Sequence, residues 1–236
     1  MYPAELVAPM RQELDQVGFE EMMTPEAVDA AVNSAGTVLV VLNSVCGCAA
    51  GSMRPGVKKA IQQAANLPGK LTTTFAGVDR EAVERARKYM LPYPPSSPSI
   101  ALFKDGKLVH MIERHNIEGR SAQMIAENLM SGLAIGMSFE GFIPVLYFER
   151  HDFILNALDA IINHIDKIER ISHGEFKVPV VIRAVTADAG PFYSGITHSQ
   201  DFTKLLESGV SFPVVDPKEG KDVLRAFRDA VDSKRP

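Results

Sequence analysis

The stretch Thr37-Val-Leu-Val-Val-Leu-Asn43, continued by Ser44-Val-Cys-Gly-Cys48, decides the fold of this 236-residue chain. Its first seven residues are uncharged, rich in β-branched side chains and too few for a typical helix, which predicts a buried strand. The only two cysteines of the chain follow, before a segment that can begin a helix. A helix N-terminus offers unpaired N–H groups and partial positive charge, and both stabilise a reactive thiolate. The pattern therefore predicts thiol–disulfide chemistry where a strand meets a helix.

The one-residue spacing of Cys46 and Cys48 restricts how the two thiols can react. Residues i and i+2 of a helix point about 200° apart, whereas a disulfide needs Cβ atoms about 3.8 Å apart. A bridge therefore requires the backbone to leave the helical conformation, and Gly47 makes that departure easier. We expect a strained, readily reduced disulfide, which suits a catalyst better than a structural crosslink.

Two other interpretations of the cysteine pair are open. The thiols can be small buried hydrophobes. They can also bind a metal, but tetrahedral sites want four ligands and the sequence has no second cysteine pair. His110 and His115 would have to complete such a site, and as a strand or loop pair they are expected at the surface. We therefore predict no metal site.

Composition excludes several other classes of protein. The chain is 46% hydrophobic and 23% charged, with a net charge of −4, so it carries no electrostatic footprint for nucleic acid. No apolar run approaches the ~20 residues of a membrane helix, and the N-terminus lacks the features of a signal peptide. We expect a cytoplasmic protein without nucleic-acid or membrane partners, where paired cysteines indicate redox or metal chemistry.

Local patterns predict an α/β domain in the first half of the chain. We expect helices at 4–17, 24–32, 53–65, 80–90 and 120–133, and strands at 37–43, 71–75, 100–103 and 108–112. Thr24 and Asp79 are expected N-caps, Pro25 a first-turn proline, and Asp105-Gly106 a hairpin turn. From the second helix onward, this is the element order of a thioredoxin-like domain.

Several motifs in residues 1–133 are distinctive in combination. They are Asn43-Ser-Val-Cys-Gly-Cys-Ala-Ala-Gly51, Arg54-Pro55, Phe75-Ala-Gly77, Pro95-Ser-Ser-Pro-Ser99 and His110-Met-Ile-Glu-Arg-His115. With these motifs the segment resembles the bacilliredoxin family over nearly a whole bacilliredoxin.

The resemblance implies roles for the two thiols. Bacilliredoxins remove bacillithiol from S-bacillithiolated proteins. By this similarity, Cys46 attacks the mixed disulfide and takes the bacillithiol, and Cys48 is the resolving or regulatory thiol. No metal or organic cofactor is required, and bacillithiol is the co-substrate. The implied partners are S-bacillithiolated proteins and a bacillithiol disulfide reductase system, and a homodimer is left open.

The resemblance also implies substrate-binding residues around the cysteines: Gly47, Arg54, Ser97 and Pro98. Pro98 would follow a cis peptide bond beside the active cysteine, the alternative being an ordinary trans proline. Pro92, Pro94 and Pro95 are expected to be ordinary trans prolines of the loop. Arg54 is a candidate for stabilising the Cys46 thiolate, and a solvated helix arginine is its alternative.

The second half is also predicted to alternate strands and helices, which favours parallel α/β packing. We expect strands at 142–148, 178–185 and 212–215, and helices at 151–168 and 219–231. On the first of these helices, apolar residues from Phe153 to Ile168 fall on one face. Thr197-His-Ser-Gln200 has the spacing of a capping box and is expected to open a helix through Leu206.

Motifs in this half resemble part of the pyrimidine-binding domain of transketolases and 2-oxo-acid dehydrogenase β subunits. They are Gly132-Leu-Ala-Ile-Gly136, Gly141-Phe-Ile-Pro-Val145, Pro179-Val-Val-Ile-Arg183, Thr197-His-Ser-Gln200 and Phe212-Pro-Val-Val-Asp-Pro217. We therefore expect a thioredoxin-like domain at 1–133, followed by a partial thiamine-diphosphate-binding-like α/β three-layer segment at 134–236. A natural fusion and a misjoined gene both fit this join.

This second resemblance implies vestigial cofactor-binding residues. His198 matches the family's active-site histidine, Phe148 and Phe153 lie near the pyrimidine-contacting aromatics, and Glu127 aligns with the activating acid. The alternatives are a first-turn histidine, core aromatics and a solvated helix acid. Because the diphosphate-binding domain is not matched, we do not expect thiamine diphosphate to bind. A subunit or fragment of a thiamine-diphosphate enzyme, and an inert or interaction module, remain alternatives for this half.

Overall fold

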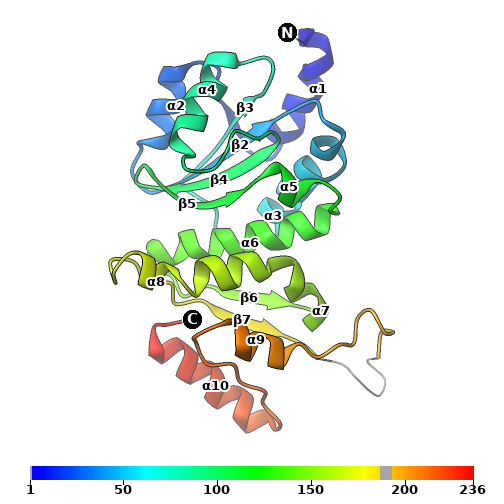
Figure 1. The fold of residues 1–236 in the computed structure, drawn as a ribbon, viewed down its shortest axis with the longest axis vertical. Coiled ribbons are helices and arrows are strands. Elements are labelled where there is room, and N and C mark those ends of the chain that lie inside the picture. The colour runs from blue at the N-terminus through cyan, green and yellow to red at the C-terminus, as the bar shows by residue number, and fades with distance from the viewer. Residues whose placement is uncertain (1, 187–192) are drawn as a thin grey trace. The chain divides into compact units, whose positions relative to one another are not determined.

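The computed structural model describes residues 2–186 and 193–236 (Figure 1). The chain forms two compact units, Met1–Gly136 and Met137–Pro236, and each is described by itself.

The first unit is built on a mixed β-sheet whose described strands run in the order β1-β3-β2-β4-β5. Strand β3 is parallel to β1 and β2, while β4 is antiparallel to β2 and β5. Parallel strands followed by an antiparallel hairpin agree with the order of elements that the sequence predicts. The elements are α1 (Ala4–Asp15), β1 (Glu20–Glu21), α2 (Pro25–Val32), β2 (Thr37–Asn43), the π-helix η1 (Ala49–Met53), α3 (Arg54–Gln63), β3 (Lys70–Phe75), α4 (Arg80–Tyr89), β4 (Ser99–Lys104), β5 (Lys107–Ile112), α5 (Arg114–Ile117) and α6 (Ala122–Phe139).

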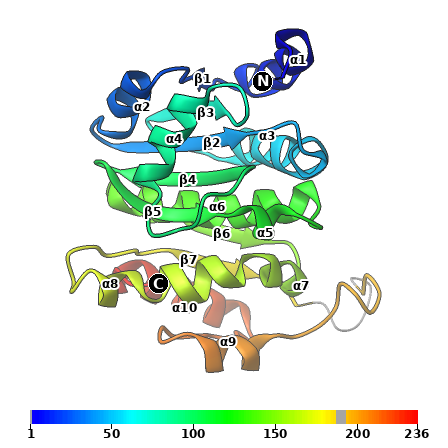
Figure 2. The same cartoon turned by 45° about the horizontal axis from the view of Figure 1, so that its top comes forward.

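Strand β2 lies at the centre of this sheet, and all seven of its residues are buried. Successive side chains of a strand point to opposite faces. Accordingly, Leu39 and Val41 join the hydrophobic cluster that includes residues of α1, α3 and α6, whereas Val38 and Val40 join the cluster with α2 and α4. Helices α2 and α4 lie side by side (Figure 2). The cysteine segment follows β2 on the α3 face, since both cysteines pack against the first cluster.

Helix α6 approaches its neighbours closely because two glycines leave room for it. A Cβ at Gly56 of α3 would lie 2.7 Å from the Cβ of Ile125, and one at Gly132 of α6 would lie 2.3 Å from Cδ2 of His110. His110 is therefore buried in β5, with Nε2 3.2 Å from Oδ1 of Asn128. The expectation of a surface position for His110 is wrong, because α6 covers it.

Most local expectations for the first unit are confirmed. Strand β2 has the expected bounds, and the hairpin turns at Asp105 and Gly106, both with positive φ. Thr24 caps α2, accepting the N–H of Ala27 at 3.2 Å. Asp79 differs, because its carboxylate accepts from the N–H of Phe75 at 2.8 Å rather than from a helix N–H. Helix α6 continues beyond the expected end at residue 133, and β1 and α5 were not expected.

The second unit contains a parallel pair of strands, β6 (Val145–Phe148) and β7 (Val181–Ala184), within its described residues. Its helical elements are α7 (His151–Ile154), the 3-10 helix η2 (Leu155–Ala157), the π-helix η3 (Ala160–Ile165), α8 (Ile168–Ile171), α9 (Thr203–Gly209) and α10 (Gly220–Ser233). Helix α10 confirms the expected final helix, and it begins with a capping box between Glu219 and Asp222.

Three expectations for this unit are wrong. The helix expected at 151–168 is divided into short α, 3-10 and π segments, although Ala157, Ile161 and Ile165 are buried as its apolar face requires. Residues 212–215 form no strand, since no neighbouring strand pairs with them and Pro213 has no N–H to donate. The Thr197 segment is a turn, and α9 begins only at Thr203.

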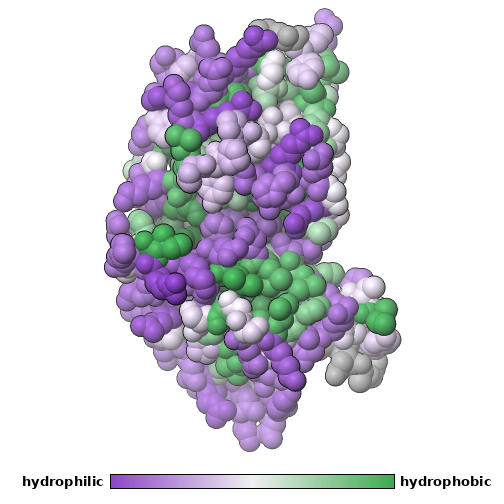
Figure 3. Space-filling view, in the orientation of Figure 1, coloured by the Kyte–Doolittle hydropathy of each residue, from purple (hydrophilic) through white to green (hydrophobic). Residues whose placement is uncertain are grey.

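Exposed apolar side chains are concentrated in the second unit. Figure 3 shows hydrophobic side chains reaching the surface among polar ones. Large hydrophobic residues exposed in this unit include Phe142, Ile143, Val145, Tyr147, Leu155, Ile171, Tyr193, Ile196, Leu205, Val215, Val223, Leu224 and Phe227. A surface of this kind is a feature of interaction sites and of incompletely covered sheets. Within residues 2–186 and 193–236, no helix is long and apolar enough to cross a membrane.

Candidate active site

Cys46 lies where β2 gives way to a helical segment, as the sequence predicts. Helical conformation begins at Gly47 and continues through η1 into α3. The carbonyl of Cys46 accepts the first hydrogen bonds of this segment, from the N–H of Ala49 at 2.9 Å and of Ala50 at 3.1 Å. The Cys46 side chain is thus held at a helix N-terminus, where N–H groups are available to it.

Several donors converge on the Cys46 sulfur. The N–H of Cys48 donates to Cys46 Sγ at 3.4 Å. A hydrogen bond from the Cys48 thiol is the largest cause that lowers the pKa of Cys46, and the backbone N–H groups of Cys48 and Ala49 and the charge of Arg114 act in the same direction. Partial burial opposes them without reversing the shift. Cys46 is therefore the thiol that ionises more readily.

The pKa of Cys48 changes in the opposite direction and is raised. Burial raises the pKa of Cys48, and the hydrogen bond and negative charge of the neighbouring Cys46 raise it further. Both thiols are free and half-buried. The pair is therefore asymmetric, with Cys46 favoured as the thiolate and Cys48 as the protonated donor.

Arg54 is a buried residue that fixes the loop before the cysteines. Its side chain is only 3% exposed, and its Nη1 donates to Oδ1 of Asn43 at 3.2 Å and to the carbonyl of Ser44 at 3.1 Å. Its Nε lies 3.0 Å from Oε1 of Glu13 in α1. The alternative of a solvated helix arginine is wrong, because α1 and the end of β2 enclose the guanidinium.

Ser44 links this loop to Cys46. The N–H of Ser44 donates to Oδ1 of Asn43 at 2.9 Å, and the Ser44 hydroxyl accepts from the N–H of Cys46 at 3.4 Å. Arg54 and Asn43 thus position the backbone from which Cys46 projects. No local pattern predicts the part that Arg54 takes in this network, because Arg54 lies on α3 and meets Asn43 and Ser44 only through the fold.

Arg114 is a functional candidate that the sequence reasoning missed. Its positive charge helps to lower the pKa of Cys46 and partly offsets the rise in the pKa of Cys48. The pKa of Arg114 is itself raised, chiefly by its hydrogen bond and ion pair with Glu118 and further by the two thiols. Its Nη2 also pairs with Oε1 of Glu118 at 3.2 Å. Arg114 falls within the His110–His115 motif, which was the one available signal, but the motif alone assigned it no role.

The loop before β4 contributes the expected cis proline. The Ser97–Pro98 peptide bond is cis, as the family resemblance implied. Leu42 at the end of β2 pairs with Ser99, which places this peptide beside the strand end that leads to the cysteines. Leu91–Pro92 is also cis, so the expectation of a trans bond at Pro92 is wrong.

The remaining candidates near the thiols differ in exposure. Pro98 is buried, Ser97 is half-buried and Gly47 is exposed. A Cβ at Gly47 would meet no atom within 4 Å, so packing does not require glycine there. His115 is exposed, whereas His110 is buried against α6. In the described part of the chain, no three His, Cys, Asp or Glu residues gather as metal ligands.

The expected thiamine-type residues fall in both units. In the second unit, the rings of Phe153 and His198 meet edge to face, with centroids 5.4 Å apart, and Phe148 is buried on β6. Glu127 belongs to the first unit, on α6, where it is buried and accepts from Nε2 of Gln123 at 2.7 Å. The alternative of a solvated Glu127 is therefore wrong.

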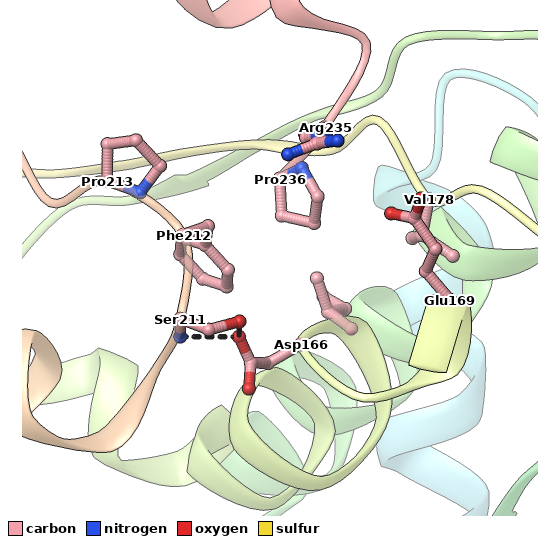
Figure 4. A pocket seen from close by; sticks show the side chains of 9 residues that line it. Asp166, Glu169, Val178, Ser211, Phe212, Pro213, Arg235 and Pro236 are labelled. Carbon is pink, nitrogen blue, oxygen red and sulfur yellow. Dashed lines mark hydrogen bonds between the residues drawn. The ribbon is translucent and has the colours of Figure 1, made fainter. Parts of the chain in front are cut away.

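Two cavities of the second unit lie elsewhere. One, of about 140 Å³, is lined by Asp166, Ser211 and neighbouring residues, and Asp166 accepts from the N–H and hydroxyl of Ser211 (Figure 4). The other, of about 960 Å³, is lined by residues of β7 and α10 among others. None of the four expected cofactor residues lines either cavity.

Comparison with known proteins identifies the first unit. The disulphide isomerase family matches residues 2–134. A bacilliredoxin of Cytophaga hutchinsonii is 63% identical over 129 residues, which cover 55% of this chain and 95% of the relative. The chain belongs to the bacilliredoxin family. Another bacilliredoxin, from Salinibacter ruber, is 53% identical over 131 residues, which cover 55% of this chain and 77% of that relative.

The bacilliredoxin resemblance is thereby confirmed for the matched segment. Among solved structures, mitochondrial thioredoxin 3 of Saccharomyces cerevisiae is 14% identical, with a TM-score of 0.34, covering 55% of this chain and 99% of that one. A thioredoxin mutant of Halobacterium salinarum is 16% identical with a TM-score of 0.33, covering 47% and 87% respectively. Residues 135–236 lie outside the family match, and their transketolase-like resemblance stays a prediction.

Proposed function

We propose that this protein is a thiol–disulfide oxidoreductase that removes bacillithiol from S-bacillithiolated proteins through a mixed disulfide on Cys46. The observation that carries the proposal is the polarised thiol pair at the start of a helix. The N–H of Cys48 points at Cys46 Sγ, and the pKa of Cys46 is lowered while that of Cys48 is raised. The similarity to bacilliredoxins supports bacillithiol as the co-substrate.

The first step is a thiol–disulfide exchange. The Cys46 thiolate attacks the bacillithiol sulfur of the mixed disulfide, so that the Cys46–bacillithiol bond forms and the bond to the substrate protein breaks. The electron pair of the broken bond leaves with the protein thiolate, which is then protonated. Cys48 does not compete as a nucleophile, because its raised pKa keeps it protonated at this stage.

The second step regenerates Cys46. Once Cys48 loses its proton, its sulfur attacks Cys46 Sγ and releases bacillithiol, leaving a Cys46–Cys48 disulfide. A second bacillithiol thiolate can instead attack the adduct and leave as bacillithiol disulfide. In either case two electrons from a bacillithiol disulfide reductase system restore the thiols. The reaction as proposed uses no metal or organic cofactor.

The surrounding residues are assigned distinct parts in this proposal. Gly47 gives the backbone the freedom to leave the helix when the two thiols join. Ser97 and Pro98, beside the end of β2, contact the disulfide-linked substrate. Arg54 does not contact substrate and acts instead as a positioning residue, because its guanidinium is buried against Asn43 and Ser44. A cytoplasmic setting, in which S-bacillithiolated proteins are the partners, follows from the same proposal.

The proposal is tested by measuring the release of the protein thiol from a purified S-bacillithiolated test protein. With reduced bacillithiol and its reductase present, we expect the native protein to release the test protein's thiol and Cys46→Ser to release none. Cys48→Ser should still accept bacillithiol, and should turn over only through added bacillithiol. Equal activity of native protein and Cys46→Ser would overturn the proposal.

A further inference from the structure

The segment that follows β5 brings an arginine to the thiol pair. Helix α5 packs against η1, the π-helix that follows Cys48, and its last residue, Ile117, is fully buried in the same hydrophobic cluster that the cysteines contact. At its other end, the N–H of Arg114 donates to the hydroxyl of Ser96 at 3.4 Å. Arg114 is thus fixed between the cysteine segment and the cis-proline loop, within electrostatic reach of both sulfurs.

The Arg114 guanidinium remains accessible from solvent. Its side chain is 45% exposed, and its partner Glu118 is 59% exposed. An exposed ion pair of this kind is weak and is easily exchanged for another anion. Arg54, by contrast, is 3% exposed and donates to the loop before Cys46, so it has no capacity for a ligand. Of these two arginines, only Arg114 can bind an incoming group.

Arginine offers a planar set of donors that matches a carboxylate. When Cys46 is joined to a small thiol, its negative charge is gone, and Arg114, whose charge acts on that sulfur, is a cation available to a carboxylate on the small thiol. We propose that Arg114 is a specificity-determining residue that selects mixed disulfides whose small-thiol part carries a carboxylate. The inference rests on the proposed function, since it concerns the thiol that Cys46 takes up.

Glu118 is the residue that this carboxylate must displace. Burial is the main cause of the raised pKa of Cys48, and the charge of Glu118 adds to it, so Glu118 disfavours an anion beside that thiol. A carboxylate on the small thiol therefore competes with Glu118 for Arg114. Removing the charge of Glu118 should strengthen the preference for carboxylate-bearing substrates, whereas removing Arg114 should abolish it.

Two matched mixed disulfides of one test protein measure the preference for a carboxylate and the parts that Arg114 and Glu118 take in it. One has 3-mercaptopropionic acid on the protein thiol, and the other has the neutral isostere 3-mercaptopropionamide. The measured quantity is the rate constant for transfer of each small thiol to Cys46 in the full chain, followed by intact mass spectrometry. We expect Arg114→Ala to lower the acid-to-amide rate ratio about fivefold, the upper range for an exposed ion pair. Glu118→Gln should raise the ratio.

Arg80→Ala, which removes an exposed arginine at the start of α4, is the charge-matched control and should leave the ratio unchanged. A change in thiolate pKa alone would slow both probes equally. If the native protein accepts both small thiols and Arg114→Ala has the same acid-to-amide rate ratio as the native protein, this inference is overturned and the proposed function stands. No transfer from either probe, while an S-bacillithiolated test protein still transfers bacillithiol to the native protein, would also overturn this inference. No transfer from the S-bacillithiolated protein either would overturn the proposed function as well.

Discussion

Replacing Arg54 by methionine tests how the fold holds the nucleophile in place. The substitution keeps an unbranched apolar stem but removes two hydrogen bonds from a charged, buried donor, to Oδ1 of Asn43 and the carbonyl of Ser44. At about 1.5 kcal/mol for each bond to a charged donor, the loss is about 3 kcal/mol. The ion pair to Glu13 adds little, because Glu13 is 38% exposed.

Hydrogen exchange of the β2 amides measures this loss directly. These amides belong to the fully buried central strand and exchange when the first unit unfolds. A loss of about 3 kcal/mol corresponds to exchange about 100-fold faster. Arg54→Met should also slow alkylation of Cys46, because Ser44 no longer holds the backbone before it.

Arg85→Met is the matched control, since Arg85 also donates to two partners, Asp29 and Tyr89, but its side chain is 37% exposed. It should change β2 exchange far less. Equal effects of the two variants would contradict the conclusion that burial makes the Arg54 network important. Unchanged hydrogen exchange of the β2 amides in Arg54→Met would contradict the same conclusion.

The remaining predictions concern the thiol site, α6 and the second unit. Cys48→Ala removes the thiol donor that lowers the pKa of Cys46, so the pH at half-maximal Cys46 alkylation should rise; an unchanged midpoint would contradict the assigned cause. Gly132→Ala should lower the free energy of unfolding by about 1–3 kcal/mol in urea denaturation, because the new Cβ would overlap His110. Gly47→Ala has room for its Cβ and should fold normally, but a timed oxidation should show slower formation of the Cys46–Cys48 disulfide. Calorimetry with thiamine diphosphate and Mg²⁺ should show no binding, since the expected cofactor residues line neither described cavity of the second unit. Measurable heat of binding would instead favour the alternative that this half is part of a thiamine-diphosphate enzyme.

Local sequence patterns predicted the parts of the first unit that depend on near neighbours. The seven buried residues of β2, the Thr24 cap and the Asp105-Gly106 hairpin each have their determinants within a few residues, and each is found as expected. The position of the cysteines follows from the same local order of strand and helix. For these features, the sequence pattern and the fold agree.

Contacts between distant segments were not predictable in this way. Arg54 becomes buried because α1 brings Glu13 to it, and the charge of Arg114 acts on the thiols because α5 packs against η1. No local pattern predicted the burial of Arg54, and the motif that contains Arg114 did not predict its position near the thiols. The same limit applies in the second unit, where 212–215 has the composition of a strand but no strand pairs with it. The capping-box spacing at 197–200 likewise did not begin a helix.

Trapping the mixed disulfide shows whether Cys46 is the thiol that takes up bacillithiol. The Cys48→Ala variant is mixed with an S-bacillithiolated test protein for a single turnover, quenched with acid and digested, and the cysteine peptide is analysed by mass spectrometry. We expect one bacillithiol on Cys46 for each test-protein thiol released. Release of that thiol without an adduct on Cys46, or no transfer by a folded variant, would contradict it.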